Sequence, residues 1–387
     1  MPGVVDYDLH GIVRIRLIGA RARDVAAVTA QLGLPPGPPA ADPDIVVRFV
    51  EHLPLARPVR HIGVRDAGFT DDAFLLLRGP HKSRVHVRIP LEDVGGRCEI
   101  VCESGLRAVP LLIAVANASA LAKGVLPMHA AAFTYEGAGT LVTGWARGGK
   151  TETLLAFMAR GAVYIGDEWV YLTPDGRMLG LPEPTKLWDW HLAEAPDFLA
   201  ALDRRARARL RRFRGMDLGL RFAGRALAGR GAGLRARLHH LLESQRYVHA
   251  HPEQLFGAEK CALEGRLDKV VLVVSGDEPR VWAEPTDAGE IARRMLFSLE
   301  HERLDLRAAY LKFRFAFPQR RNPLFDQMGA IQEELLMRAL DGTEAHVVHH
   351  PYPAPIATLF DVLAPVVRGR AEEGRRRARL PVGADLA

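Results

Sequence analysis

Residues 144–151 read Gly-Trp-Ala-Arg-Gly-Gly-Lys-Thr and fit the spacing G-x-x-x-x-G-K-[ST]. A loop of this kind binds phosphate, because its glycines let backbone N–H groups curve around phosphate oxygens and the next helix adds the positive end of its dipole. In that chemistry the Lys150 ammonium reaches the β- and γ-phosphates and the Thr151 hydroxyl ligates Mg²⁺. The competing interpretation is a chance match in a chain rich in alanine, glycine and arginine. The candidate nucleotide-binding residues are Gly144, Trp145, Ala146, Arg147, Gly148, Gly149, Lys150, Thr151 and Glu152.

The elements on both sides of this loop favour the phosphate-binding interpretation. The run 140–143 predicts a short apolar strand before it, and 152–160 predicts a helix behind it, which is the context that the motif requires. A further buried strand, expected at 162–165, leads to the adjacent acids Asp167 and Glu168. Carboxylates at a strand end in the same domain are candidates for a general base and a metal ligand. The alternative is that the two acids merely begin a hairpin.

Two further residues near the loop have open roles. His129 lies in the run 128–133, before a glycine-containing turn that leads into the loop strand. A lone histidine on a strand is more often structural than catalytic, so its position alone decides neither role. Lys186 follows the rigid Leu-Pro-Glu-Pro-Thr run at 181–185 and is either a phosphate contact or a surface lysine.

The segment 129–172 resembles the catalytic core of the HPr kinase/phosphorylase family. The resemblance is carried by a His-Ala dipeptide that enters a hairpin, the strand TLVTG, the loop GWARGGKT and the continuation ETLLAFMARGAVYIGDEWVYL. It implies an α/β fold, a phosphoenolpyruvate-carboxykinase-like P-loop kinase domain that uses ATP and Mg²⁺. The first hundred or so residues do not match this family.

The same resemblance implies roles for individual residues. Asp167 would be the general base on an acceptor hydroxyl, and His129 would orient or polarise it. Glu168 stands where the family has a second Asp and would be either a metal ligand, together with Thr151 and Asp167, or a hydrogen-bond partner. The family's signature with a catalytic arginine has no clear match, and Arg246, ahead of a strand expected at 247–250, is our candidate for it. This departure argues against HPr as the substrate and against the reverse, phosphorolytic reaction.

The sequence therefore predicts an ATP-dependent phosphotransferase, a serine or hydroxyl kinase. A serine-bearing peptide or protein is the first choice of acceptor, because stand-alone HPr kinase-like proteins with an unrelated N-terminal domain modify ribosomally made peptides. A small-molecule hydroxyl kinase would differ only in its acceptor.

A different class of protein is a nucleotide-binding regulator without kinase activity, whose basic segment engages nucleic acid. The Glu168 replacement favours this class, and the intact Lys150, Thr151 and Asp167 oppose it. The family tends to assemble through its kinase domains, so the resemblance also implies a homo-oligomer.

Charge is unevenly distributed along the chain. The 387 residues carry a formal net charge of +6, yet the segment 203–237 holds twelve arginines against two aspartates. The segment 366–387 holds six arginines against three acids, so the rest of the chain is net negative by seven charges. The Arg-rich segment 203–237 is either a solvated helix face under compositional bias or a docking site for an acidic partner. Because the positive charge is confined to two segments, the distribution argues against general nucleic-acid binding.

We expect three parts along the chain. Residues 1–104 read as a small α+β domain with an accessory or substrate-selecting role, based on a helix expected at 22–32 and alternating strand runs such as 85–89. Residues 105–365 form the HPr kinase-like catalytic domain, which opens with a helix at 109–123. Residues 366–387 lack apolar periodicity and are expected to be a flexible basic tail.

Composition excludes several classes of protein. No apolar run approaches the roughly 20 residues that span a bilayer, and the first residues lack the basic and apolar regions of a secretion signal. The three cysteines, Cys98, Cys102 and Cys261, are too few to staple a chain of this size and read as reduced thiols. These features predict a cytoplasmic protein with no membrane partner.

The stretch 310–317 alternates aromatic and other residues with a period of two. RNA-binding sheets interleave aromatic and basic residues similarly. We favour a half-buried strand or helix end with Phe313, Phe315 and Phe317 in the core, because no accompanying glycine pattern supports RNA binding. The run 323–340 carries apolar residues at helical spacing and predicts a core-packed helix.

Overall fold

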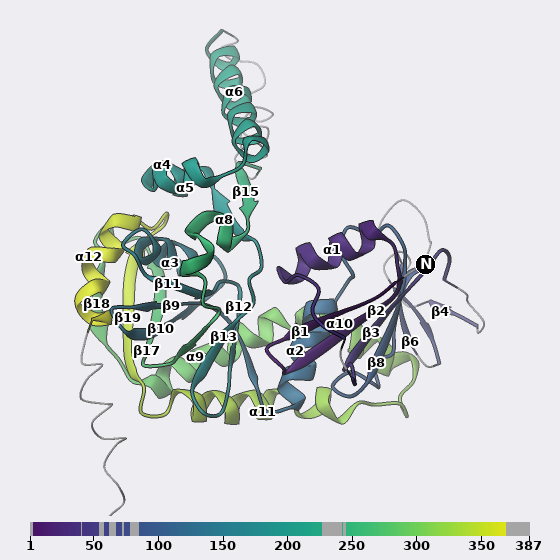
Figure 1. Cartoon of the computed structure of the whole chain (residues 1–387). Coiled ribbons are helices and arrows are strands. Elements are labelled where there is room, and N and C mark those ends of the chain that lie inside the picture. Colours follow the sequence, from purple (N-terminus) through teal and green to yellow (C-terminus); the bar gives the residue numbers. More distant parts are fainter. Residues whose placement is uncertain are drawn as a thin grey trace, which may run out of the picture.

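The computed structural model describes residues 3–39, 41–53, 58–61, 67–71, 73–77, 85–226, 242 and 245–368. These residues form a mixed α/β protein with two large sheets side by side and one long helix that stands away from the body (Figure 1). The mixed α/β class predicted from the sequence is confirmed. The remaining part of the chain, which includes 227–241 and 369–387, lies outside the described residues.

The N-terminal unit is an eight-stranded sheet in the order β1-β2-β3-β8-β7-β6-β5-β4. Helix α1 (Ala22–Leu32) connects two of its parallel strands, β2 and β3, and has the bounds that the sequence predicted. The strands are β1 (Gly3–Leu9), β2 (Val13–Ala20), β3 (Ile45–Val50), β4 (Arg60–His61), β5 (Ala67–Thr70), β6 (Ala73–Leu77), β7 (Val85–Ile89) and β8 (Cys98–Glu103). Cys98 and Cys102 are buried in β8, and burial raises the pKa of each thiol to about 12, so both are inert structural cysteines.

The second sheet has the order β16-β13-β12-β9-β10-β17-β19-β18, and β11 also pairs with β9. Its strands are β9 (Leu126–Tyr135), β10 (Ala138–Gly144), β11 (Val163–Gly166), β12 (Trp169–Leu172), β13 (Arg177–Gly180), β16 (Glu264–Arg266), β17 (Lys269–Gly276), β18 (Trp282–Pro285) and β19 (Glu344–Pro351). Strand β10 runs parallel to β17, which runs parallel to β19, whereas β9 is antiparallel to β10. The phosphate-loop sequence follows β10, in the middle of this sheet.

Helices cover both faces of the second sheet, and strand β9 shows why. Met128, Ala130 and Ala132 point into a core shared with helices α2 (Leu112–Ala122), α9 (Ala288–Glu302) and α11 (Pro323–Leu340). The alternating residues Ala131 and Phe133 point into a second core, formed with α3 (Lys150–Met158) and α12 (Ile356–Val367). Side chains alternate between the faces of a strand, so a strand buried on both sides is apolar throughout.

A helix from the second half of the chain packs against the N-terminal sheet. Helix α10 (Leu304–Ala316) places Phe313 against Phe69 of β5, with ring centroids 6.2 Å apart. The Asn322 side chain donates to the backbone oxygens of Leu91 and Val94. One continuous hydrophobic core therefore runs from the N-terminal sheet to the second sheet.

The stretch 310–317 is the end of helix α10, one of the two forms predicted for it. Phe313 is fully buried, but Phe315 is 79% exposed, which contradicts its predicted place in the core. Residues two positions apart on a helix face different directions, so Phe315 points away from the side that Phe313 presents to the N-terminal sheet. Phe317, just past the helix end, is partly buried against the same core, with Arg60 of β4 over its ring. The helix predicted at 323–340 is confirmed as α11.

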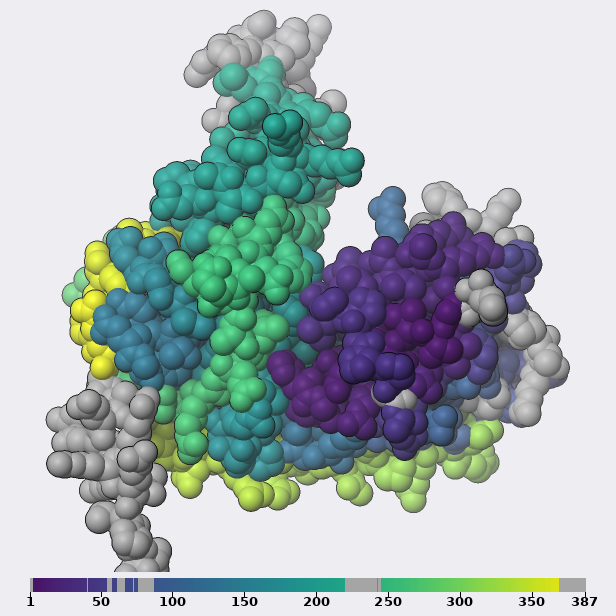
Figure 2. Space-filling view, in the orientation of Figure 1, coloured from purple at the N-terminus to yellow at the C-terminus, as the bar shows by residue number. Residues whose placement is uncertain are grey.

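Helix α6 (Arg204–Ala226) extends away from the body, as Figures 1 and 2 show. Its base rests on α4 (Asp189–Glu194), α5 (Pro196–Ala201), α8 (Pro252–Phe256) and the two-stranded sheet β14 (Thr185–Trp188) and β15 (Tyr247–Ala250). In the part of the chain that is described, no helix has the length and apolar character needed to cross a membrane. Helix α12 continues to Val367, and residues 369–387, where a flexible basic tail is predicted, lie outside the described residues.

Candidate active site

The phosphate-loop sequence forms a tight curve between β10 and α3. Gly149 has a φ of +106°, and a Cβ there would lie 2.4 Å from Nε2 of His350, so only glycine fits. His350 is buried on β19, and its Nε2 lies 2.7 Å from the carbonyl oxygen of Gly148. His350 of strand β19 therefore supports the backbone of the loop at Gly148 and Gly149. Sequence spacing gave this histidine no role.

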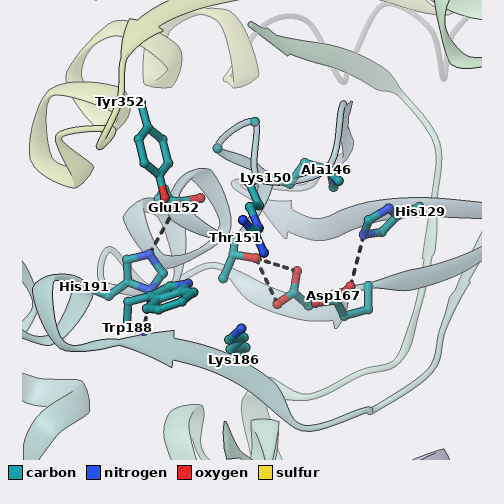
Figure 3. A pocket seen from close by; sticks show the side chains of 14 residues that line it. His129, Ala146, Lys150, Thr151, Glu152, Asp167, Lys186, Trp188, His191 and Tyr352 are labelled. Atoms are coloured by element: carbon teal, nitrogen blue, oxygen red, sulfur yellow. Dashed lines mark hydrogen bonds and ion pairs between the residues drawn. The ribbon is translucent and has the colours of Figure 1, made fainter. Parts of the chain in front are cut away.

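The loop encloses one end of a cavity of about 220 Å³ (Figure 3). The lining residues are His129, Ala146, Arg147, Gly148, Gly149, Lys150, Thr151, Glu152, Asp167, Glu168, Lys186, Trp188, His191 and Tyr352. Most of the residues singled out from the sequence thus meet in one place. Arg147 and Glu168 both adopt positive φ, at +62° and +70°, and such backbone strain in non-glycine residues clusters at functional sites.

Lys150 is the first residue of α3 and is buried at the centre of the site. Its Nζ donates to the carbonyl oxygens of Trp145, at 2.9 Å, and Gly144, at 3.3 Å. Burial lowers the pKa of Lys150, and the surrounding carboxylates of Glu168 and Asp167 oppose that shift. No carboxylate pairs directly with the ammonium group within the described residues, so its charge faces the cavity.

Thr151 and Asp167 are in direct contact. The Thr151 hydroxyl lies 3.2 and 3.3 Å from the two carboxylate oxygens of Asp167, as Figure 3 shows. Asp167 is 2% exposed, and its burial, together with the nearby Glu168 charge, raises its pKa to about 7. A carboxyl group with a pKa near neutrality is suited to accept a proton at physiological pH.

His129 bridges two carboxylates. Its Nε2 lies 3.0 Å from Glu168 and its Nδ1 lies 2.6 Å from Glu302, at the end of α9. Burial would lower the pKa of His129, but these two hydrogen bonds outweigh it and raise the pKa. The hydrogen bond from His129 in turn lowers the pKa of Glu168. The hydrogen bond from His129 therefore favours the ionised form of Glu168 beside Asp167.

His129→Gln is expected to move the acidic limb of the pH–rate profile to higher pH. The His129 charge lowers the pKa of Asp167, so its removal lets that pKa rise further above neutrality. We expect kcat/KM above this limb to fall by about tenfold or less. The measurement is kcat/KM for the acceptor, which reports groups of the free enzyme, against pH for the wild type, His129→Gln and the control His52→Gln on the N-terminal unit. An unchanged midpoint in His129→Gln would contradict this role and leave His129 a structural residue.

Glu152 and His191 form a second buried pair in the cavity wall. The backbone N–H of Trp188 donates to Nδ1 of His191, so Nε2 carries the proton and donates to Glu152 at 3.1 Å. Burial raises the pKa of Glu152, but the bond from His191 and the neighbouring charges outweigh it, and the pKa is lowered overall. No sequence pattern pointed to His191, because it lies far from the loop in the chain.

Lys186 reaches the cavity from β14, as Figure 3 shows. Its Nζ lies 4.4 Å from the ring centroid of Trp188 and 4.1 Å from that of Tyr247, a cation–π arrangement that orients the ammonium group. Burial lowers the pKa of Lys186, and the charge of Arg147 adds to this effect. Of the two interpretations of Lys186, the structure favours a contact inside the cavity.

Arg246 does not line this cavity. It forms ion pairs with Asp189 and Asp217, and Arg214 of α6 also contacts Asp189, at 2.6 Å. The cluster joins α6 to the base on which it rests. The structure thus places the candidate catalytic arginine in the attachment of the projecting helix, away from the phosphate loop.

Two observations bear on metal binding. The Thr151 hydroxyl and the Asp167 carboxylate offer adjacent hard oxygen atoms, the ligand type that Mg²⁺ prefers. Within the described ranges, no three His, Cys, Asp or Glu side chains gather as a metal-binding group. Glu168 is already engaged by His129. The protein therefore contributes a partial ligand set, such as a metal shared with substrate phosphates requires.

No family model matches the chain, and no curated protein matches it significantly. Any functional assignment consequently rests on the residues of the site themselves.

Proposed function

We propose that this protein is an Mg·ATP-dependent kinase of the HPr kinase-like type that phosphorylates a hydroxyl group, preferably a serine, on a peptide or protein. The observation that carries the proposal is the convergence of Lys150, Thr151 and Asp167 on one cavity beneath a glycine-rich loop. The loop connects a central strand to a helix, as phosphate-binding loops do. A phosphoenolpyruvate-carboxykinase-like arrangement of the second sheet is part of this proposal.

ATP would bind with its phosphates in the loop. The backbone N–H groups of the loop, the start of α3 and the Lys150 ammonium supply positive charge for the β- and γ-phosphates. Thr151 and Asp167 would hold Mg²⁺ together with phosphate oxygens, and the ion would neutralise charge on the transferred group. Trp145 is 53% exposed beside the ring of His301, and in this proposal it would cover the nucleotide.

Asp167 would receive the proton of the acceptor hydroxyl. As the bond between the γ-phosphorus and the bridging oxygen breaks, the acceptor oxygen forms the new bond to phosphorus and its proton passes to Asp167. His129 acts through Glu168 and Asp167 as a positioning residue, since it contacts Glu168 directly. Catalysis then consists of orientation and electrostatic stabilisation.

The test of this function is to incubate the protein with Mg·ATP and candidate acceptors and to measure both ADP release and acceptor phosphorylation. Acceptor-dependent ADP formation with a stable phosphoester on serine is the expected result. Binding of DNA or RNA with a steep salt dependence, and no acceptor-dependent turnover, would instead favour a nucleotide-binding regulator.

Helix α6 provides a surface for an acidic part of the acceptor. Leu210 and Asp217 are buried on its inward side. The outward side carries four exposed arginines, namely Arg204, Arg205, Arg211 and Arg212.

Replacing these four arginines by glutamine is expected to raise the acceptor KM severalfold and to leave the KM for ATP unchanged. Charges on the outer face of α6 attract an acidic acceptor during association, but they do not touch the nucleotide site. Steady-state kinetics at low and physiological salt measure both constants. An unchanged acceptor KM at low salt would rule out docking on α6.

A further inference from the structure

A second cleft, of about 510 Å³, adjoins the nucleotide cavity. It shares Glu168 and Lys186 with that cavity, and the N-terminal unit closes its opposite side through Ala30 and Gln31 of α1. The other lining residues are Trp169, Glu183, Pro184 and His249. In Figure 2 the surface is hollowed between α1 and the projecting α6. The cleft therefore leads from the junction of the two units to the carboxylates of the site.

The N-terminal wall of this cleft is held in a fixed position. Gly33, at the end of α1, has a φ of +69°, and a Cβ there would lie 1.9 Å from the carbonyl oxygen of Pro182. The carbonyl oxygen of Gly33 lies 2.8 Å from Nε2 of His251. A second contact joins His10 to the carbonyl oxygen of Gly180 at 2.8 Å. The N-terminal unit thus packs directly against the segment that carries Glu183.

Glu183 is the unsatisfied group of the cleft. Its Oε2 is buried and has no hydrogen-bond partner among the residues that the structure describes. Burial raises the pKa of Glu183 to about 8, and the neighbouring carboxylates Glu168 and Asp167 add to that effect. A buried polar atom without a partner costs free energy, and a site for a ligand is one explanation for its retention.

The charges that face Glu183 favour a cationic ligand. Asp167 and Glu168 repel its carboxylate form, and His249 is a poor counter-charge because burial lowers its pKa. The Lys186 ammonium is held over the rings of Trp188 and Tyr247. A cation brought in by a ligand would relieve the repulsion and satisfy Oε2.

We propose that this cleft is the acceptor site and that it takes a polypeptide segment with a lysine or arginine beside the phosphorylated hydroxyl. Glu183 recognises the cationic side chain, and the hydroxyl lies toward Asp167. The N-terminal unit, through α1, forms one wall of the site and so takes part in substrate selection. The basic outer face of α6 contacts acidic residues farther along the same acceptor. This inference rests on the proposed kinase function and adds the substrate class to it.

The test uses short fluorescent peptides with one central serine, identical except that the flanking residues are lysine, norleucine or glutamate. Binding is measured by anisotropy to the full chain with Mg²⁺ and a non-hydrolysable ATP analogue. We expect the lysine peptide to bind about tenfold more tightly than the glutamate peptide, and Glu183→Gln to abolish this ratio. Glu264→Gln, an exposed glutamate on β16, is the matched control and should keep the ratio.

A second variant tests the wall of the cleft. Gly33→Ala is expected to weaken binding of the lysine peptide, because its new Cβ would collide with Pro182. Gly11→Ala has a similar positive φ of +73° in open space and serves as its control. The absence of a lysine preference in the wild type, or its survival in Glu183→Gln, overturns the proposal. A lysine preference in binding without phosphorylation of any peptide would support the cleft and overturn the kinase function instead.

Discussion

Asp167→Asn is expected to reduce phosphoryl transfer by about 10²- to 10⁴-fold, the range that a general base contributes. Asparagine has nearly the same shape but cannot accept the proton of the acceptor hydroxyl. ATP binding should survive, because Lys150 and the loop backbone are unchanged. Single-turnover phosphorylation and calorimetric titration with ATP measure the two effects. Full turnover by Asp167→Asn would contradict the assignment of the base.

The raised pKa of Asp167 gives this variant a second, independent signature. In the folded protein the carboxyl titrates near pH 7, whereas in the unfolded chain it titrates near its ordinary value of 3.8. Between these values the folded state holds a proton that the unfolded state releases, so this group's contribution to stability is lost as pH rises toward 7. Asp167→Asn lacks this loss, and we expect its stability advantage over the wild type to grow from pH 4 to 7 and then level off. Urea unfolding of the two proteins across this range measures it.

The rate should depend on pH in the opposite sense. Only ionised Asp167 accepts a proton, so the wild-type kcat/KM for the acceptor, which reports groups of the free enzyme, is expected to increase as pH rises through the region of the Asp167 pKa. The ionised form of Asp167 is therefore the form that accepts the proton in catalysis and also the form that lowers the stability of the fold. A pH-independent stability difference between wild type and Asp167→Asn would contradict the raised pKa.

Lys150→Ala is expected to lower kcat/KM for ATP by at least about 10²-fold. The ammonium group faces the cavity, and within the described part of the chain it donates hydrogen bonds to the backbone carbonyl oxygens of Gly144 and Trp145. Its loss removes the charge that would contact the β- and γ-phosphates, and the apolar packing of α3 remains. ATP affinity and ADP release are the measurements, and circular dichroism checks the fold.

The control for Lys150→Ala is Lys260→Ala, which removes an exposed lysine outside the cavity. We expect the control to have wild-type kinetics. If Lys150→Ala bound and turned over ATP normally, the loop would not be the nucleotide site, and the kinase proposal would fail with it.

Local patterns predicted the elements that carry the phosphate loop. The strand before it, the helix behind it and the strand that ends at Asp167 all depend on short-range apolar periodicity and glycine placement, which the sequence displays directly. Helices α1 and α11 have the predicted bounds for the same reason. The core position predicted for Phe315 is wrong, because a period-two pattern in a short run does not reveal which side of a helix will be covered.

The partners of the site residues could not be predicted locally. Glu302, which bridges to His129, and His191, which bridges to Glu152, come from distant segments that only the packing of α9 and α4 brings to the cavity. Arg246 was plausible from its place before a strand, but the fold directs it to Asp189 and Asp217.

The sequence by itself determined the loop, its lysine and threonine, and the acid at the next strand end, because backbone geometry and hydrophobic periodicity act over a few residues. Only the tertiary structure determined the pKa values and charges of the site residues. The pKa of Asp167 depends on burial and on Glu168, and the charge on Glu168 depends on His129. The tertiary structure also brought α1 of the N-terminal unit to one side of a cleft beside Glu183. Burial and charge proximity are properties of residues distant in the chain, and they exist only once the chain has folded.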